Sequence, residues 1–195
     1  MTDAEVKSAS AAGLPAGRWI DIAIGCQDLW LRDGPETLAR YPVSTAAAGC
    51  GQRQGSWMTP AGWHVVRARI GEGLPSGAVL RGRRFTGEVC DAAAYAAAPD
   101  QDWILTRILW LSGLERGVNR GGDVDTFRRY IYLHGCPDAV RLGSPGSKGC
   151  VRLRNADMLM LFDQVAVGTP VLIRADTRLQ APTPFPGSGG MAGNT

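Results

Sequence analysis

The chain has 195 residues, of which 45% are apolar, a length and composition that suit one domain with a full hydrophobic core. Its net charge of +3 is small and its Lys and Arg residues are scattered, which argues against nucleic-acid binding. No stretch approaches the ~20 apolar residues that cross a membrane. Residues 1–17, with Asp3 and Glu5, lack the basic start and apolar core of a secretory signal, so we expect a cytoplasmic protein without a membrane partner.

The first part of the chain predicts short strands separated by Gly- and Pro-containing turns. Apolar and β-branched residues gather in four segments that we predict as strands, at residues 19–24, 29–31, 38–44 and 63–70. Residues 46–56 are small and Gly-rich, which indicates a mobile loop. The fourth strand carries His64, and a single histidine in a strand is more often packed than catalytic.

The middle of the chain is less regular. Residues 74–99 combine a Gly/Arg stretch with an alanine-rich run that predicts either a short helix or a loop. The most apolar run, residues 103–111, predicts a central strand. Residues 114–129 are polar, which is typical of a solvated excursion or of a loop that forms one wall of a functional cleft.

The end of the chain predicts one helix, one strand and a tail. Residues 156–165 carry apolar side chains at helical spacing, with Asn155 placed to cap the helix and methionines as core filler. Residues 169–173 predict the last strand. Residues 181–195 are rich in Pro, Gly and Ser, which predicts disorder. We therefore predict a mainly β (α+β) domain with one or two helices, built as a mixed sheet or a sandwich.

The five cysteines indicate reduced thiols. They are Cys26, Cys50, Cys90, Cys136 and Cys150. Their odd number and irregular spacing differ from the cysteine pattern of a secreted protein that is held together by disulfides. No CxxC pair exists, so a structural zinc site has little support. A metal held by His134, Cys136 and Cys150 is an alternative that we do not favour, and we expect neither metal nor cofactor.

One stretch carries the chemistry. A short β-type run, residues 130–133, is followed by His134-Gly135, then by a Pro/Gly/Ser loop, and then by Ser147-Lys148-Gly149-Cys150. A histidine at a strand end and a cysteine sixteen residues later can meet after the loop doubles back. A thiol nucleophile needs such an imidazole beside it, and backbone N–H groups around Gly149 could form an oxyanion hole.

These residues resemble the signature of the L,D-transpeptidase catalytic domain (YkuD type), and the likeness spans roughly residues 18–175. Further matching motifs are Thr59-Pro60-Ala61-Gly62 before a strand, Leu142-Gly143, and Gly168-Thr169-Pro170-Val171. The resemblance implies a β-sandwich-like catalytic fold over residues 18–175, with an extension at 1–17 and a flexible tail at 176–195. One departure is Lys148, where the family usually has a second histidine.

The chemistry assigns roles to the motif residues. Cys150 would attack an amide carbonyl and form a thioester, and His134 would act as general base and then as acid. Ser147 would hold the loop or donate to the site, although a plain turn serine fits equally well. Cys136 is a rival nucleophile that we place far behind, because a proline follows it.

Two cations beside the nucleophile are candidate substrate ligands. Arg152 is suited to a substrate carboxylate, with a surface arginine as its alternative. An ammonium at Lys148 cannot accept a proton, so it would lower the pKa of the thiol, hold the carboxylate of D-alanine, or point into solvent.

The resemblance also implies a substrate, the peptidoglycan stem tetrapeptide or a muropeptide that carries it. The enzyme would cut between meso-diaminopimelate and the terminal D-alanine. Transfer to water is an L,D-carboxypeptidase reaction, which we favour for a cytoplasmic protein in muropeptide recycling. Transfer to another stem gives a 3-3 cross-link, the transpeptidase alternative, and a non-catalytic muropeptide-binding module is a third possibility.

Overall fold

The structure, a computed structural model, describes residues 13–176 and 184–186. The predicted extension at 1–17 and tail at 176–195, with the disorder expected for 181–195, lie largely outside these ranges. Within them, no helix is both long enough and apolar enough to cross a membrane.

The described chain is mainly β, as predicted. The strands are β1 (Arg18–Ala23), β2 (Asp28–Asp33), β3 (Glu36–Pro42), β4 (Gly62–Ile70), β5 (Ala78–Arg81), β6 (Arg84–Val89), β7 (Leu105–Gly113), β8 (Tyr132–Cys136), β9 (Val151–Arg154) and β10 (Pro170–Arg174). The helices are α2 (Ala92–Ala97), a 3₁₀ turn η1 (Gly122–Val124) and α3 (Asn155–Gln164).

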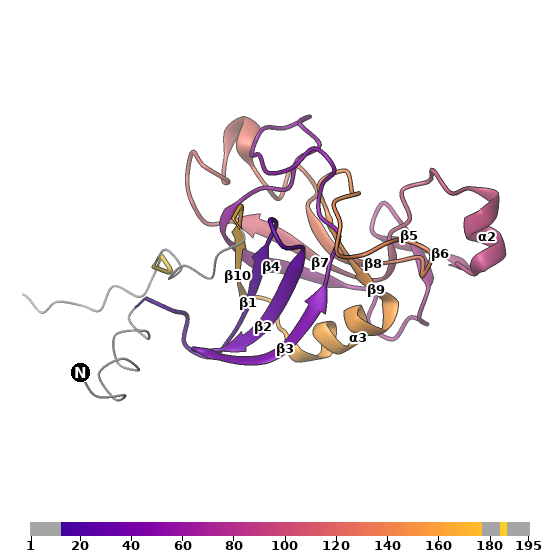
Figure 1. The fold of residues 1–195 in the computed structure, drawn as a ribbon, viewed down its shortest axis with the longest axis horizontal. Coiled ribbons are helices and arrows are strands. Elements are labelled where there is room, and N and C mark those ends of the chain that lie inside the picture. The colour runs from indigo at the N-terminus through magenta and orange to yellow at the C-terminus, as the bar shows by residue number, and fades with distance from the viewer. Residues whose placement is uncertain (1–12, 177–183, 187–195) are drawn as a thin grey trace, which may run out of the picture.

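The strands form one sheet that branches at β7. The main path runs β3-β2-β1-β10-β4-β7-β5-β6, and β8 leaves it by pairing with β7, followed by β9. Most pairs are antiparallel, whereas β1 with β10 and β8 with β9 are parallel. Because β7 pairs with β4, β5 and β8, the sheet curls round, and α3 lies below it next to β7 and β8 (Figure 1).

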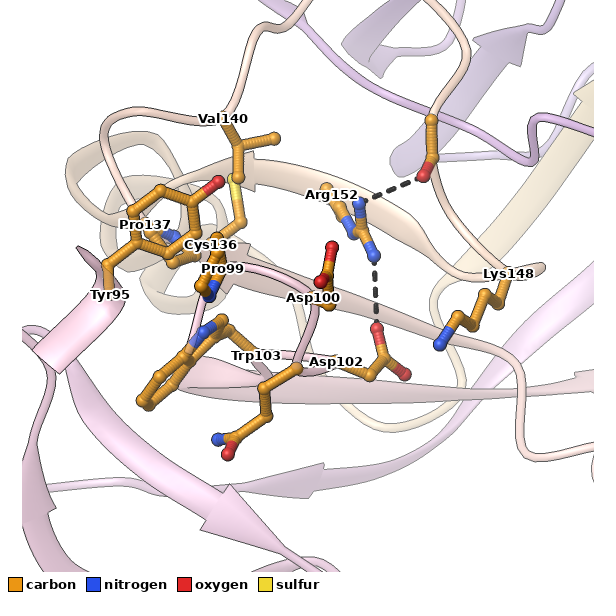
Figure 2. A pocket seen from close by; sticks show the side chains of 12 residues that line it. Tyr95, Pro99, Asp100, Asp102, Trp103, Cys136, Pro137, Val140, Lys148 and Arg152 are labelled. Atoms are coloured by element: carbon orange, nitrogen blue, oxygen red, sulfur yellow. Dashed lines mark hydrogen bonds and ion pairs between the residues drawn. The ribbon is translucent and has the colours of Figure 1, made fainter. Parts of the chain in front are cut away.

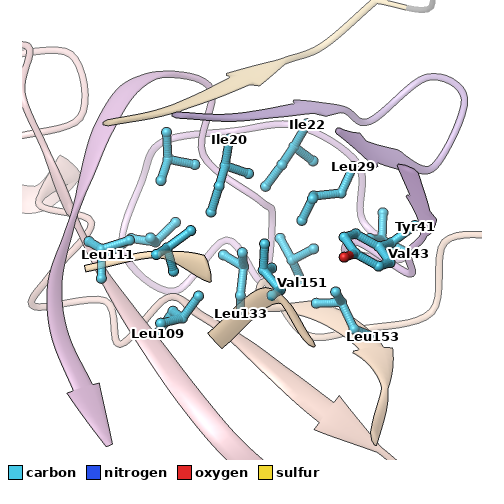
Figure 3. Close-up of a cluster of buried hydrophobic side chains, with 14 of the residues drawn as sticks. Ile20, Ile22, Leu29, Tyr41, Val43, Leu109, Leu111, Leu133, Val151 and Leu153 are labelled. Atoms are coloured by element: carbon cyan, nitrogen blue, oxygen red, sulfur yellow. The ribbon is translucent and has the colours of Figure 1, made fainter. Parts of the chain in front are cut away.

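The main hydrophobic core fills the inside of this curl. Ile20, Ile22 and Leu29 of β1 and β2 face Leu109 and Leu133 of β7 and β8 across it (Figure 3). Buried side chains of α3 close the core, namely Met158, Leu161 and Phe162. Two facing layers of apolar side chains make the domain sandwich-like, and the methionine at position 158 is core filler as expected.

Three local expectations need correction. Residues 74–99 contain the hairpin β5–β6, which the sequence did not predict, because β6 exposes every residue and so shows no alternation of burial. Strand β8 does not end before His134 but continues through it to Cys136. Asn155 does not cap α3: it is the first helical residue, and its Oδ1 accepts a hydrogen bond from Thr106 Oγ1.

The Gly-rich loop at residues 46–56 is irregular but tied down at several points. Ala47 N–H donates to the carbonyl of Ser147 at 2.9 Å, and Gly51 N–H donates to the carbonyl of Thr59 at 2.9 Å. These bonds fix the loop beside the segment that precedes β9.

Candidate active site

The register of β8 and β9 places the candidate nucleophile and base on one face. His134 pairs with Arg152, and Leu133 pairs with Val151. Leu133 and Val151 point into the main core, so the alternation of strand side chains turns His134 and Arg152 to the opposite face. Cys150, which directly precedes β9, lies on the same face as His134 by the same alternation. The sequence prediction that these two residues come together is consistent with this register.

The Cys150 sulfur lies against backbone rather than against charged groups. Its Sγ is 3.4 Å from the N–H of Tyr132, which donates to it, and 3.4 Å from the carbonyl oxygen of Tyr130, to which the thiol donates. Burial, together with the Asp102 carboxylate, raises the pKa of the Cys150 thiol to about 12. The Tyr132 N–H and the guanidinium groups of Arg152 and Arg129 act in the opposite direction. The Cys150 thiol is therefore neutral at neutral pH.

The His134 imidazole is held in one tautomer. Its Nδ1 lies 2.8 Å from the carbonyl oxygen of Gly135, and because a carbonyl only accepts, Nδ1 carries the proton. Burial lowers the pKa of His134 to about 4, so the ring is neutral at pH 7. In the part of the chain that the structure describes, no group hydrogen-bonds Nε2, whose lone pair is therefore available. No hydrogen bond joins this ring to Cys150, although the two share a face.

The loop before the nucleophile is shaped by Ser147 and Gly149. Ser147 Oγ donates to the carbonyl oxygen of Cys150 at 2.5 Å and accepts from the N–H of Gly149 at 3.2 Å. Gly149 has φ +131°, and an added Cβ there would lie 3.1 Å from Cδ1 of Ile131. Since Ser147 occupies the Gly149 N–H, the N–H of Cys150, which bonds to none of the described residues, is the better oxyanion donor.

A threonine far away in sequence also holds this loop. Thr59 is fully buried, its Oγ1 donates to the carbonyl oxygen of Gly149 at 2.9 Å, and it accepts from Ala46 N–H at 3.0 Å. The Thr59-Pro60 motif, which the sequence only placed before a strand, thus connects β4 to the nucleophile loop.

Arg129 is a site residue that sequence reasoning missed. Its guanidinium donates to the carbonyl oxygens of Gly51, Gln52 and Met58, and it acts electrostatically on Cys150. It therefore joins the segment at 114–130 to the loop at 51–58. The only sequence signal was an arginine directly before the motif strand.

The remaining candidates occupy different positions. Arg152 is largely buried and donates to Asp102 Oδ1 at 3.0 Å and to the carbonyl oxygen of Gly146 at 3.1 Å. Lys148 is exposed and lines a cavity with Arg152, and it is not among the charges that act on the Cys150 thiol. Cys136 is buried, its Sγ–H donates to the carbonyl oxygen of Leu153, and burial raises its pKa to about 11.

No metal centre is built by the described residues. Among them, no group of three or more His, Cys, Asp or Glu side chains could hold a metal ion. All five cysteines are free thiols.

The fold and site together define a class: a β-rich domain with a neutral imidazole on one strand and a thiol directly before the adjacent parallel strand. The family model of the L,D-transpeptidase catalytic domain (YkuD) matches residues 17–173. The chain belongs to this family. A search of curated protein sequences found no match.

Three solved structures were compared with this chain. The Bdellovibrio bacteriovorus protein Bd1075 has a TM-score of 0.50 at 18% identity, over 84% of this chain and 52% of its own. The avibactam carbamoyl enzyme of Ldtfm has a TM-score of 0.51 at 16% identity, over 83% of this chain and 50% of its own. The L,D-transpeptidase of Xylanimonas cellulosilytica has a TM-score of 0.48 at 19% identity, over 82% of this chain and 63% of its own. The chain thus spans about half to two-thirds of the length of these structures.

Proposed function

We propose that the protein is a cysteine-dependent acyl-transfer enzyme that cleaves the bond between meso-diaminopimelate and D-alanine in peptidoglycan stem tetrapeptides. One observation carries the proposal: Cys150 and His134 share a face of β8–β9, and the Gly135 carbonyl leaves Nε2 of His134 free to accept a proton. A thiol with such a base is the arrangement that nucleophilic acyl transfer needs.

In the first half-reaction, Sγ of Cys150 attacks the carbonyl carbon at the L-centre of diaminopimelate, and the thiol proton passes to Nε2 of His134. The Cys150 N–H stabilises the oxyanion. The imidazolium then protonates the departing amine, the C–N bond breaks, and D-alanine leaves a thioester behind. Because the resting pair is neutral, the proton moves during the attack and not before it.

In the second half-reaction, His134 is neutral again and takes a proton from the group that attacks the thioester. Water as acceptor gives a tripeptide, the L,D-carboxypeptidase reaction, which is our first candidate. We further propose that this reaction serves muropeptide recycling in the cytoplasm, a setting that suits five free thiols.

A second candidate is transpeptidation, in which the amine of another stem is the acceptor and a 3-3 cross-link forms. The charged cavity beside Arg152 favours it, since a stem end carries charges that such a cavity can bind. In both candidates the thioester on Cys150 is the common intermediate.

The test is incubation of the purified protein with disaccharide-tetrapeptide, with the products read by mass. We expect loss of one D-alanine, and a protein adduct of tripeptide mass after rapid acid quenching. Cys150→Ala should give neither product. A cross-linked dimer would identify the transpeptidase, and unchanged tetrapeptide with measurable binding would instead identify a non-catalytic muropeptide-binding module.

A further inference from the structure

A cavity of about 220 Å³ opens between the segment that follows α2 and the strands β8 and β9. Cys136 of β8 and Arg152 of β9 both line it. Both side chains lie on the same face of the sheet as His134. Arg152 pairs with His134 across the two strands, and Cys136 lies two residues after His134 on β8, where side chains return to the same face. Cys136 and Arg152 therefore place the cavity next to the face that carries the proposed nucleophile and base, although neither His134 nor Cys150 lines it.

One side of the cavity is mostly apolar. Figure 2 shows there the rings and the aliphatic side chain of Tyr95, Pro99, Trp103, Pro137 and Val140. Such a surface is suited to the methylene groups of a ligand, because apolar area removed from water stabilises binding.

The other side is charged, with side chains of both signs. Figure 2 shows Asp100, Asp102, Lys148 and Arg152 gathered there. Asp102 and Arg152 neutralise each other through an ion pair of 3.0 Å. The structure gives the Lys148 ammonium and the Asp100 carboxylate no hydrogen bond or ion pair with any described residue. The cavity thus offers one cation and one anion that remain free for a ligand.

We propose that this cavity is a subsite for an α-amino-acid zwitterion at the end of a methylene chain. Lys148 binds the carboxylate of the ligand, Asp100 and the exposed side of Asp102 bind its ammonium, and the apolar side receives the chain. This inference rests on the proposed function, and it names the part of the substrate that the cavity recognises. The D-centre of meso-diaminopimelate has this chemistry, because it carries an ammonium and a carboxylate on one carbon.

The zwitterion can come from two sources. It is either the side arm of the donor stem that acylates Cys150, or the incoming amino acid end of an acceptor. If the cavity binds the donor stem, a substitution in the cavity changes the KM of D-alanine release. If it binds the acceptor, the substitution changes the share of thioester that is transferred to an amine. Kinetics with matched substrates therefore distinguish the two sources.

The first experiment measures D-alanine release from three disaccharide-tetrapeptides, which carry meso-diaminopimelate, its D-centre amide, or L-lysine at the third position. The amide and lysine both lack the free carboxylate. If the donor supplies the zwitterion, Lys148→Met raises KM about fivefold for the first substrate only, the fold-change of one partly exposed charge pair. Asp100→Asn raises KM for all three substrates, because the lysine side chain also ends in an ammonium.

The second experiment adds free meso-diaminopimelate as acceptor to the tetrapeptide reaction. If the acceptor supplies the zwitterion, Lys148→Met lowers the share of aminolysis about fivefold and leaves the KM of the donor unchanged. Arg141→Met and Asp138→Asn are matched controls, since both residues are exposed in the same part of the chain and neither lines this cavity. If Lys148→Met matches the controls in both experiments, the cavity is not a zwitterion subsite.

A third measurement does not depend on turnover. Titration calorimetry of free meso-diaminopimelate into the Cys150→Ala protein should show binding that weakens about fivefold when Lys148→Met is added, with L-lysine as a weaker probe. Equal affinity with and without Lys148→Met overturns the subsite. A wild-type protein that binds the zwitterion but releases no D-alanine retains the subsite and overturns the proposed function instead.

Discussion

The two histidines of the described chain occupy nearly identical local environments in different regions of the sheet. His134 on β8 and His64 on β4 are both fully or almost fully buried, and burial lowers the pKa of each to about 4. In each ring, Nδ1 contacts a backbone carbonyl, that of Gly135 at 2.8 Å and that of Gly62 at 2.9 Å. Burial and pKa therefore do not separate them.

The second ring nitrogen, Nε2, distinguishes the two histidines. Nε2 of His64 lies 3.1 Å from Oγ1 of Thr126, so both nitrogens of that ring contact the protein. Nε2 of His134 has no hydrogen-bond partner among residues 13–176 and 184–186, and its ring lies on the face of Cys150. A histidine with both nitrogens occupied stabilises structure, whereas one with a free nitrogen beside a thiol can transfer protons. Four predictions test this difference.

The largest effect is expected for the nucleophile. Cys150→Ala should reduce D-alanine release by more than roughly 10⁴-fold, because it removes the attacking sulfur and leaves both histidines in place. Cys136→Ala should retain turnover, since the Cys136 sulfur is buried and donates to a backbone carbonyl. Release that survives in Cys150→Ala but not in Cys136→Ala would assign the nucleophile to β8.

The second largest effect is expected for His134 and distinguishes it from His64. His134→Ala should lower kcat by about 10²–10⁴-fold, the usual contribution of a positioned acid–base group. His64→Ala should lower the melting temperature, while the folded protein keeps its kcat. Steady-state kinetics and thermal melts on both variants check this. A loss of kcat that is larger in His64→Ala would mean that β4 carries the base.

Acidification should destabilise the protein through both rings. Each folded-state pKa, about 4, lies below the ordinary histidine value of 6.5, so the unfolded chain binds protons first as the pH falls. Stability should thus be flat above pH 6.5 and fall between pH 6.5 and 4, by about 2 kcal/mol per histidine at pH 5. Denaturant unfolding at several pH values measures the loss. His64→Gln should reduce it by half, and an unchanged slope would show that His64 does not contribute.

The smallest effect concerns the loop that carries the nucleophile. Thr59→Val keeps the shape of the side chain but removes its hydrogen bonds to Gly149 and Ala46. We expect a loss of about 1–3 kcal/mol in unfolding free energy, the cost of unpaired buried polar groups, and a several-fold fall in kcat. Thr59→Ser, which keeps the hydroxyl, is the control and should recover most of the kcat. Equal kcat in both variants would mean that the bond does not position Cys150.

The sequence predicted the parts of the site that are encoded by neighbouring residues. His134-Gly135 and Ser147-x-Gly149-Cys150 are short motifs, and β8, which carries the first, pairs in parallel with β9, which follows the second. Most strands and the helix at the end of the chain were also predicted, because their apolar residues repeat with a clear period.

Contacts between distant segments could not be predicted in this way. Thr59 bonds to Gly149 across 90 positions, and Arg129 bonds to carbonyls more than 70 positions earlier. Nothing in the local sequence specifies such partners. The cap expected at Asn155 was wrong for a related reason, because a tertiary contact with Thr106 uses the oxygen that a cap would need.

The desolvation of the partly buried Cys150 side chain has a consequence for its reactivity toward oxidants and alkylating reagents. Oxidants and alkylating reagents attack thiolates, and a thiol with a pKa of about 12 is almost entirely protonated near pH 7. The free protein should therefore react slowly with hydrogen peroxide or iodoacetamide at Cys150, in spite of the role proposed for this residue. In the proposed mechanism, Cys150 becomes reactive only when a bound acyl group accepts the sulfur while His134 accepts the proton. Selectivity against unwanted electrophiles is thus built into the resting state.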